Sequence, residues 1–582
     1  MGLKINEIVR DAPFGQLVRL LTNNRVFQYP EEKADFKLPD AWLSAIAGSS
    51  RGGVETPGSS HSDGHETAGT EKSTEPGNND PNKIEPSPPA DLEASASLEK
   101  IQSAPIVPQL TKDGVILVDW YTTDDPSNPY NWSNRRRLLI SLIIGFYTFV
   151  VYMSSAIYTT AEPQIRERFG VSAVKASLGL SIYVLGYGIG PLIFSPLSEI
   201  PRIGRSPVYI VTMFLFVVLS IPTALVNNYP GLIVLRFLQG FFGSPCLASG
   251  GASMGDLYSM MHLPFALMGW VAAAFCGPAL GPLLSGFAVP VKGWRWALYE
   301  SIWASSPILL IMFFLLPETS TPTLLLQRAR RLRKLTGNEK LMSQSEINQR
   351  SLTVSAVVVD AIIKPLEITI KDPAVLFVQV YSAIVYGIYY SYFEVFPIVY
   401  NGFHHFNLGQ TGLVFLCILV GCILGCISYG SLLYFIVLPQ IKKFGPGPQE
   451  QILLPGIPAS FGPVIGLFMF AWTASAAIHW IVPTIGITIY AMSVFILMQC
   501  IFLYIPTSYP QYMSSLFAAN DFFRSALACG SILFASPMFN NLGVGRGVSL
   551  LGGLAVLGII GMLLLFKYGA ALRARSKFAT SG

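Results

Sequence analysis

The chain has 582 residues, of which 51% are hydrophobic and only 13% are charged, with a net charge of +5 and a mean hydropathy of +0.49. Soluble domains carry about 25% charged residues, so this chain has too little polar surface to dissolve as a globular protein. The mild net charge, without Lys and Arg clustered among aromatic residues, does not indicate nucleic-acid binding. The seven cysteines lack the spacing of zinc ligands or of a disulfide framework. Composition therefore indicates an integral membrane protein without a metal site.

The region before the first apolar stretch, residues 1–137, is hydrophilic, and we expect it to form an N-terminal tail. Apolar residues spaced along Ile5–Tyr29 predict a short amphipathic helix. Residues 48–97 are rich in Ser, Gly, Pro and Glu, a composition that predicts disorder.

Apolar stretches long enough to cross a membrane dominate the rest of the chain. A transmembrane helix needs roughly 20 apolar residues, and about twelve stretches meet this requirement. They are Leu138–Tyr158, Ala176–Leu197, Pro207–Val226, Gly231–Gly251, Pro264–Val289, Ala297–Leu316, Ala374–Phe396, Thr411–Leu438, Leu454–Ser475, Ile481–Tyr504, Met513–Phe539 and Ser549–Tyr568. No Asp, Glu, Lys or Arg lies between Glu450 and Asp521, so this part of the chain cannot be soluble.

The stretches fall into two groups, separated by a polar connection. The sequence predicts a first bundle over residues 138–316, a central loop over 317–373, a second bundle over 374–569 and a short tail over 570–582. The central loop contains a run of basic residues between Arg328 and Lys334. We therefore expect an all-α membrane protein.

The distribution of Lys and Arg predicts the orientation, because cytoplasmic loops carry an excess of both. If the spans alternate in direction, most of these residues lie on the side that holds both chain ends. They are Arg135, Arg136, Arg137, Arg202, Arg205, the central basic run, Lys442, Lys443, Lys567, Arg573, Arg575 and Lys577. Both termini are thus predicted to be cytoplasmic.

A tight turn follows the second stretch and contains Glu199, Arg202, Gly204 and Arg205. An acid and two arginines in such a turn can clamp the ends of neighbouring helices through ion pairs and helix-dipole contacts. The alternative is an ordinary basic cytoplasmic loop.

The fourth stretch carries an arginine in the run Leu235-Arg236-Phe-Leu-Gln239-Gly240, and it ends near Asp256. A charge in an apolar helix is costly, so Arg236 should face a wet cavity or a partner. The alternative is a buried arginine that only donates hydrogen bonds to carbonyl groups.

The fifth stretch contains Gly277-Pro278-Ala-Leu-Gly281. Glycines four residues apart allow a neighbouring helix to approach closely, and proline bends the helix. The pattern by itself predicts tight, kinked packing.

These motifs resemble those of the major facilitator superfamily, and most closely those of the fungal drug:proton antiporters, in the subgroup of caffeine, cycloheximide and polyamine exporters. The likeness extends to Asp124–Trp132, Lys364–Ile368, Tyr386–Pro397 and Ala519–Ser525. The resemblance implies two six-helix bundles of inverted repeats around a midplane cavity. It also implies gating or motif roles for Glu199, Arg202, Gly204, Arg205, Asp256, Gly277, Pro278, Gly281 and Arg524, and a role in proton transfer for Arg236. The Gly277-Pro278 motif resembles one of exporters rather than of sugar importers.

Charges inside the apolar stretches can be ordered by depth, because a helix rises about 1.5 Å per residue. Arg236 and Glu394 share the outer part of the membrane, whereas Asp521 and Arg524 lie in the inner half at i and i+3 and can pair on one face. In the facilitator fold the fourth and seventh spans line one cavity, so we expect Arg236 and Glu394 to meet there. Glu394 is the preferred proton carrier, and Asp521 is the next candidate. The alternative interpretation of Glu394 is a solvated residue at the mouth of the cavity that carries no proton.

Aromatic residues concentrate on the seventh and tenth stretches. Tyr386, Tyr389, Tyr390, Phe393 and Tyr490 suit flat or cationic organic substrates through stacking and cation–π contacts. Aromatic residues in membrane helices also serve as packing residues or interfacial belts, so both interpretations remain.

The sequence predicts a secondary active transporter that exports small organic compounds in exchange for protons. An uptake permease or uniporter of the same fold, and a non-transporting membrane receptor, are the alternatives. No phosphate-binding Gly-x-x-x-x-Gly-Lys loop, nucleophile elbow or metal cluster is present, so we expect no enzyme activity and no cofactor. The expected partners are a small-molecule substrate, protons and the bilayer. We expect a monomer in the plasma membrane.

Overall fold

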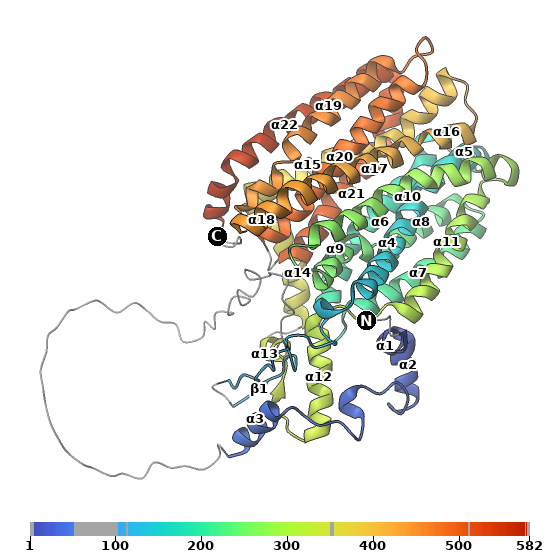
Figure 1. The fold of residues 1–582 in the computed structure, drawn as a ribbon. Coiled ribbons are helices and arrows are strands. Elements are labelled where there is room, and N and C mark those ends of the chain that lie inside the picture. The colour runs from blue at the N-terminus through green and yellow to red at the C-terminus, as the bar shows by residue number, and fades with distance from the viewer. Residues whose placement is uncertain are drawn as a thin grey trace, which may run out of the picture.

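The computed structural model describes residues 5–51, 103–111, 114–349, 354–445, 447–509, 512–576 and 578. Within these residues, twelve helical segments are long and apolar enough to cross a membrane, which confirms the predicted all-α membrane fold. Figure 1 shows the first six, in blue to green, packed beside the last six, in yellow to red.

The first bundle begins with α4 (Asn134–Ala156), which continues through η3 (Ile157–Ala161) and α5 (Glu162–Phe169). Its other spans are α6 (Ala173–Glu199), α7 (Arg205–Leu225), α8 (Tyr229–Gly243) with α9 (Pro245–Leu257), α10 (Leu263–Lys292) and α11 (Arg295–Leu315). The side chains of Ser133 and Asn228 accept hydrogen bonds from backbone N–H groups in the first turns of α4 and α8. Such caps satisfy N–H groups that have no partner inside a helix.

The second bundle begins with α15 (Pro373–Phe396), which Asp372 caps, and with the π-helical turn η4 (Pro397–Phe403). Its other spans are α16 (Leu408–Val414) with α17 (Leu416–Leu432), η5 (Leu433–Val437) and α18 (Leu438–Phe444), then η6 (Gln449–Leu453) with α19 (Gly456–Thr473), α20 (Ile481–Ser508), α21 (Met513–Leu542) and α22 (Val544–Arg575). Helix α1 (Ile5–Asp11) and the C-terminal end of α22 lie at the same end of the molecule (Figure 1). We call this end the terminal face. The end that holds α5 and α16 is called the opposite face.

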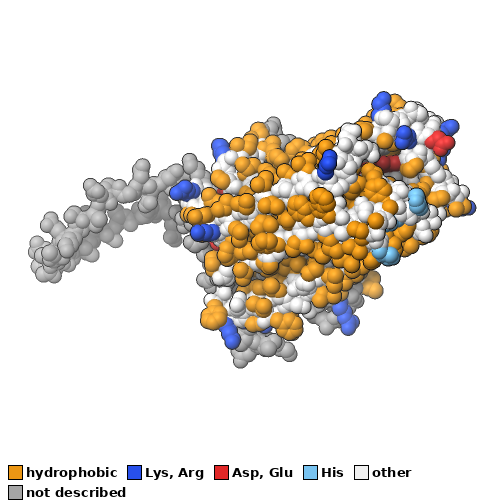
Figure 2. Space-filling model, turned by 90° about the horizontal axis from the view of Figure 1, so that it is seen from above, with side chains coloured by type: hydrophobic (Ala, Val, Ile, Leu, Met, Phe, Trp, Pro, Cys, Tyr) orange, Lys and Arg blue, Asp and Glu red, His pale blue; other side chains and the backbone are white. Residues whose placement is uncertain are grey.

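The outer surface of the bundles is apolar. Large hydrophobic side chains such as Val211, Phe214 and Val218 on α7 are exposed three or four residues apart, as expected of a helix face that contacts lipid. Figure 2 shows hydrophobic side chains over most of the helical surface.

A small module at the terminal face joins the N-terminal region to the linker between the bundles. It contains α2 (Pro13–Leu21), η1 (Pro30–Glu32), α3 (Asp40–Arg51), η2 (Pro129–Asn131), α12 (Thr321–Thr336) and α13 (Gln344–Gln349). The linker then continues as α14 (Val354–Lys371), which packs against α6, α15 and α21. The strands β1 (Ile116–Leu117) and β2 (Leu341–Met342) pair in parallel. The predicted helix over Ile5–Tyr29 is therefore two short helices, α1 and α2. Of the segment predicted to be disordered, residues 48–51 belong to α3 and the rest lies outside the described residues.

Buried ion pairs hold α12 to the rest of this module. Arg328, in the basic run of the linker, is buried and lies 2.7 Å from Asp125 Oδ2 and 3.4 Å from Glu31 Oε1. Burial of Asp125 opposes its ionisation, but hydrogen bonds from Arg328 and from backbone N–H groups keep the pKa of Asp125 below its ordinary value. The module thus gains stability at neutral pH that would be lost as the pH falls through that lowered pKa.

Candidate functional site

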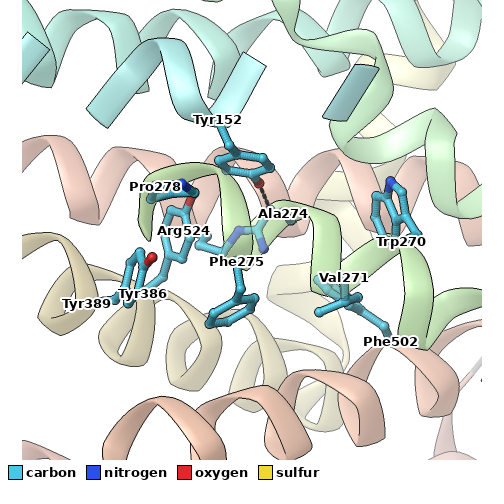
Figure 3. Close-up of a pocket in the computed structure, with 10 residues that line it drawn as sticks. All are labelled: Tyr152, Trp270, Val271, Ala274, Phe275, Pro278, Tyr386, Tyr389, Phe502 and Arg524. Carbon is cyan, nitrogen blue, oxygen red and sulfur yellow. Dashed lines mark hydrogen bonds between the residues drawn. The ribbon is translucent and has the colours of Figure 1, made fainter. Parts of the chain in front are cut away.

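A small cavity lies between the two bundles. The first bundle contributes residues of α4 and α10, and the second contributes residues of α15, α20 and α21. The lining residues are Tyr152, Trp270, Val271, Ala274, Phe275, Pro278, Tyr386, Tyr389, Phe502 and Arg524 (Figure 3).

The cavity wall is aromatic and fixed in place. The ring of Phe275 lies 5.6 Å from that of Tyr389, and the ring of Trp270 lies 5.9 Å from that of Phe502. The Trp270 indole N–H donates hydrogen bonds to Thr148 Oγ1 at 3.1 Å and to the Cys246 carbonyl at 3.2 Å. The rings of the wall are therefore already oriented for stacking contact with a bound molecule.

Arg524 is the charged residue of the lining. Its guanidinium donates to Tyr152 Oη at 3.2 Å (Figure 3), lies 4.5 Å from the centre of the Tyr386 ring and forms an ion pair with Asp521. The i, i+3 pairing of Asp521 and Arg524 is as the spacing predicts. Arg524 Nε and Asp521 Oδ2 are buried and have no hydrogen-bond partner. A polar ligand group in the cavity could supply one.

Two of the five aromatic residues predicted to form the substrate cavity, Tyr386 and Tyr389, line it. The other three are not in its lining. Tyr390 accepts a hydrogen bond from Tyr187, Phe393 stacks on Phe415 at 5.1 Å, and Tyr490 donates to the Val385 carbonyl at 2.6 Å. Residues four apart on a helix share a face, but only packing decides which face meets the cavity. Sequence reasoning missed Tyr152, Trp270, Val271, Ala274, Phe275 and Phe502, which lie on other spans.

A chain of tyrosines crosses the interface between the bundles. Tyr187 Oη on α6 lies 2.7 Å from Tyr386 Oη and 2.9 Å from Tyr390 Oη on α15. Tyr390 in turn lies 3.2 Å from Ser155 Oγ on α4. The chain leads from the cavity toward Arg236, because the Ser155 carbonyl accepts a hydrogen bond from Arg236 Nη2 at 3.3 Å.

Arg236 is completely buried, and protein groups surround its guanidinium. It donates to the carbonyls of Gly179 at 3.1 Å, Ser154 at 3.0 Å and Ser155 at 3.3 Å, and to Gln239 Oε1 at 3.1 Å. The rings of Tyr183 and Tyr158 lie 4.3 and 4.8 Å from Cζ. One interpretation of the sequence is a buried arginine that donates hydrogen bonds to carbonyl groups. Such carbonyl groups surround Arg236, together with two aromatic rings.

Glu394 is half-buried near the end of α15, at the opposite face. None of the hydrogen bonds of Arg236 goes to Glu394, and no ion pair joins the two. The carboxylate of Glu394 instead interacts with the side chains of Ser177 on α6 and Glu162 on α5. Glu162 also interacts electrostatically with Arg236, so the charge of Glu162 acts on both residues that were expected to meet.

Sequence reasoning missed Glu162. The apolar stretch of the first span ends at Tyr158, which assigns Glu162 to a loop, whereas the structure continues the helical path to Phe169. The signal that could have revealed it is a carboxylate one turn beyond an apolar helix.

The predicted motif residues lie at the terminal face and along α10. Arg205 forms an ion pair with Asp256 at 2.6 Å, whereas Glu199 and Arg202 are exposed at the turn. Gly204 has φ +82°, and a Cβ there would collide with the Glu318 carboxylate, which accepts hydrogen bonds from the N–H groups of Arg205 and Ser206. This turn requires glycine.

The glycines of the fifth span let α10 approach α4. A Cβ on Gly277 would lie 2.7 Å from the Phe149 carbonyl oxygen, and one on Gly281 would lie 3.0 Å from Met153 O. Pro278, between them, lines the cavity. The motif therefore sets the distance between two spans that bound the site.

Within the part of the chain that the structure describes, no group of three or more His, Cys, Asp or Glu residues could hold a metal ion. The site consists of rings, hydroxyls and a few buried charges, which suits binding and proton movement.

Comparison with known proteins agrees with this arrangement. The family model described as Major Facilitator Superfamily matches residues 144–532. The chain is 47% identical to an MFS-type transporter of Aspergillus violaceofuscus, over 81% of this chain and 87% of the relative. It is 37% identical to the cycloheximide resistance protein of Candida maltosa, over 98% and 99%, and 38% identical to fluconazole resistance protein 1 of Saccharomyces cerevisiae, over 81% and 86%. The structure of the xylose transporter XylE from E. coli superposes with a TM-score of 0.51 at 15% identity, covering 74% of this chain and 99% of XylE. This likeness concerns the fold.

Proposed function

The chain belongs to the major facilitator superfamily of membrane transporters, and we propose that it exports small organic compounds from the cell in exchange for protons. The names of its relatives favour this direction, since resistance to cycloheximide or fluconazole is what removal of such a compound from the cell would produce. The protein is a transporter and not an enzyme.

The observation that carries the proposal is the aromatic cavity between the bundles. Its walls come from both halves of the chain, so a rocking motion of one bundle against the other would expose the cavity to each side in turn. Rings on several walls and one arginine partly neutralised by Asp521 favour flat, largely apolar compounds with a polar group.

Proton coupling is proposed to use Glu394, with Arg236 acting on it through Glu162. Asp521 is the second candidate carboxylate, because it is buried beside the cavity and one of its oxygens has no partner. We further propose a monomer in the plasma membrane. Its terminal face would be cytoplasmic, because most of the Lys and Arg residues flank the spans on that side.

The test is transport by the purified full chain in proteoliposomes with an imposed pH gradient, using cycloheximide and fluconazole as probes. An exporter should accumulate a probe on the side that corresponds to the cell exterior, without ATP, and a protonophore should collapse the accumulation. Accumulation on the other side would identify an uptake permease. Binding without flux at any gradient would identify a receptor.

Substitution of Phe275 by alanine should weaken binding of a transported probe, because it removes a ring from the centre of the cavity wall. Loss of one aromatic contact is expected to cost about 1 kcal/mol, or roughly fivefold in Kd. Binding to the purified protein measures this. Phe146→Ala is the matched control, since Phe146 is 53% exposed on the outer face of α4. Equal effects of the two substitutions would argue against the cavity as the binding site.

A further inference from the structure

Two carboxylates from different bundles interact electrostatically at the opposite face. Glu162 lies at the start of α5 in the first bundle, and Glu394 lies near the end of α15 in the second. Ser177 Oγ, on α6, donates a hydrogen bond to Glu162 Oε2 at 3.1 Å, and Ser177 also contributes to the electrostatic environment of Glu394. We call Glu162 and Glu394 the carboxylate pair.

The hydrogen bonds of the carboxylate pair are incomplete. Glu162 Oε1 is shielded from solvent and has no hydrogen-bond partner, and Ser177 has a single hydroxyl proton for two acids. A buried carboxylate oxygen without a donor is costly. One added proton would remove this deficit, because the resulting carboxylic acid could donate to the neighbouring carboxylate.

The groups around the pair do not cancel two negative charges. The titratable and charged groups that face Glu162 are Glu394 on α15, Arg236 on α8 and Tyr158 on η3. The guanidinium of Arg236 donates its hydrogen bonds to three carbonyls and Gln239 rather than to either acid. With both acids ionised, two like charges therefore repel across the interface between the bundles.

We propose that Glu162 and Glu394 share one proton and that this proton holds the opposite face closed. In the protonated state, the O–H of one acid donates to the carboxylate of the other, which joins α5 to α15. When the proton leaves to water, both groups are ionised, the hydrogen bond is lost and repulsion separates the bundles at this face.

The direction of this effect suits an antiporter. If the opposite face is extracellular, a proton taken from outside closes the outer gate and returns the carrier toward the cell interior. Once the proton has left, the unprotonated carrier can bind substrate and open outward. This consequence rests on the proposed function, whereas the proton-dependent closure itself does not.

The test measures the distance between the bundles by spin labelling of the full chain in nanodiscs, without substrate or pH gradient. Labels are placed at Lys175→Cys on α6 and Gln410→Cys on α16, two exposed positions at the opposite face, in a background whose seven native cysteines are replaced by serine. In the parent protein, the short-distance population should dominate at pH 5 and fall as the pH rises to 8.5. Glu162→Gln and Glu394→Gln, which remove titration and charge, should each keep the short distance at every pH.

Glu167→Gln is the matched control, since it removes an exposed carboxylate from the same helix and should leave the pH response unchanged. Glu162→Asp should retain a pH response, which separates titration from general damage, and size-exclusion chromatography verifies folding. The proposal is overturned if Glu162→Gln responds to pH as Glu167→Gln does, because Glu394 would then titrate alone. It is also overturned if either glutamine variant opens at low pH. This experiment measures a distance and not transport. Proton-dependent closure could therefore be found even if proton-coupled export failed, and export could be found even if closure did not depend on the carboxylate pair.

Discussion

Replacement of Glu394 by glutamine is expected to abolish uphill export. The amide has nearly the same shape as the carboxylic acid but cannot release a proton. The variant should therefore stay in the equivalent of the protonated state and be unable to complete the proposed coupling step. Glu394 is half-buried on a helix of the second bundle and interacts electrostatically with Ser177 and Glu162 of the first. Loss of its titration would therefore disconnect the proton gradient from the relative position of the bundles. Binding of substrate from the terminal face should persist, because Glu394 is not in the cavity lining.

Accumulation of a probe in proteoliposomes, measured across imposed pH gradients, checks this result. Glu300→Gln is the matched control, since Glu300 is also half-buried, in α11, and has an oxygen without a partner. The control should still concentrate the probe. If Glu394→Gln concentrates the probe with a normal pH dependence, the assignment is wrong, and Asp521 becomes the leading carboxylate.

Replacement of Arg236 by alanine should impair both folding and export. The side chain is completely buried and donates four hydrogen bonds, of which three join α8 to α4 and α6 and one goes to Gln239 of α8 itself. Its removal leaves three carbonyls without this donor and Glu162 without its nearby positive charge. Removal of one partner from a buried charged network costs about 3–5 kcal/mol, so we expect a clear fall in Tm. Export per folded molecule should fall as well, because the positive charge no longer acts on the carboxylate pair.

Thermal unfolding and transport must be measured on the same samples. Arg236→Lys should recover part of the stability but not all of it, since an ammonium cannot reproduce the planar fork of donors. Arg295→Ala is a suitable control, because Arg295 also donates to backbone carbonyls, those of Ala224 and Val226, but at a partly exposed position. The Arg236→Ala, Glu394→Gln double variant should be less impaired in export than the two losses added, as expected for coupled residues. Strict additivity would contradict a shared step.

Hydropathy was sufficient to predict the spans. The absence of charge between Glu450 and Asp521 predicted buried or lipid-facing helices there, and the structure contains α19, α20 and the start of α21 in that stretch. The first span shows the limit of this reasoning. Its helical path continues beyond the apolar stretch because Glu162 and the polar residues after it can still form helix at the membrane edge.

Local spacing also predicted contacts within one helix and between close backbones. Asp521 and Arg524 pair at i, i+3, and the glycines of the fifth span allow backbone contact with α4. These features depend on helix geometry and on side-chain size, and both can be read from a single segment. The identity of the neighbour that the glycines contact could not be read in this way.

The sequence by itself determined that this protein is a membrane protein of about twelve spans, because hydropathy and helical period are local properties. Only the tertiary structure decided which faces of those helices meet. It put Trp270 and Phe502 into one wall with Tyr389, surrounded Arg236 with carbonyls and placed Glu162, rather than Arg236, within electrostatic interaction of Glu394. The physical reason is that each helix is apolar on nearly all sides, so hydrophobicity does not select its inward face. Close packing between helices selects it, and that packing depends on residues far apart in the chain.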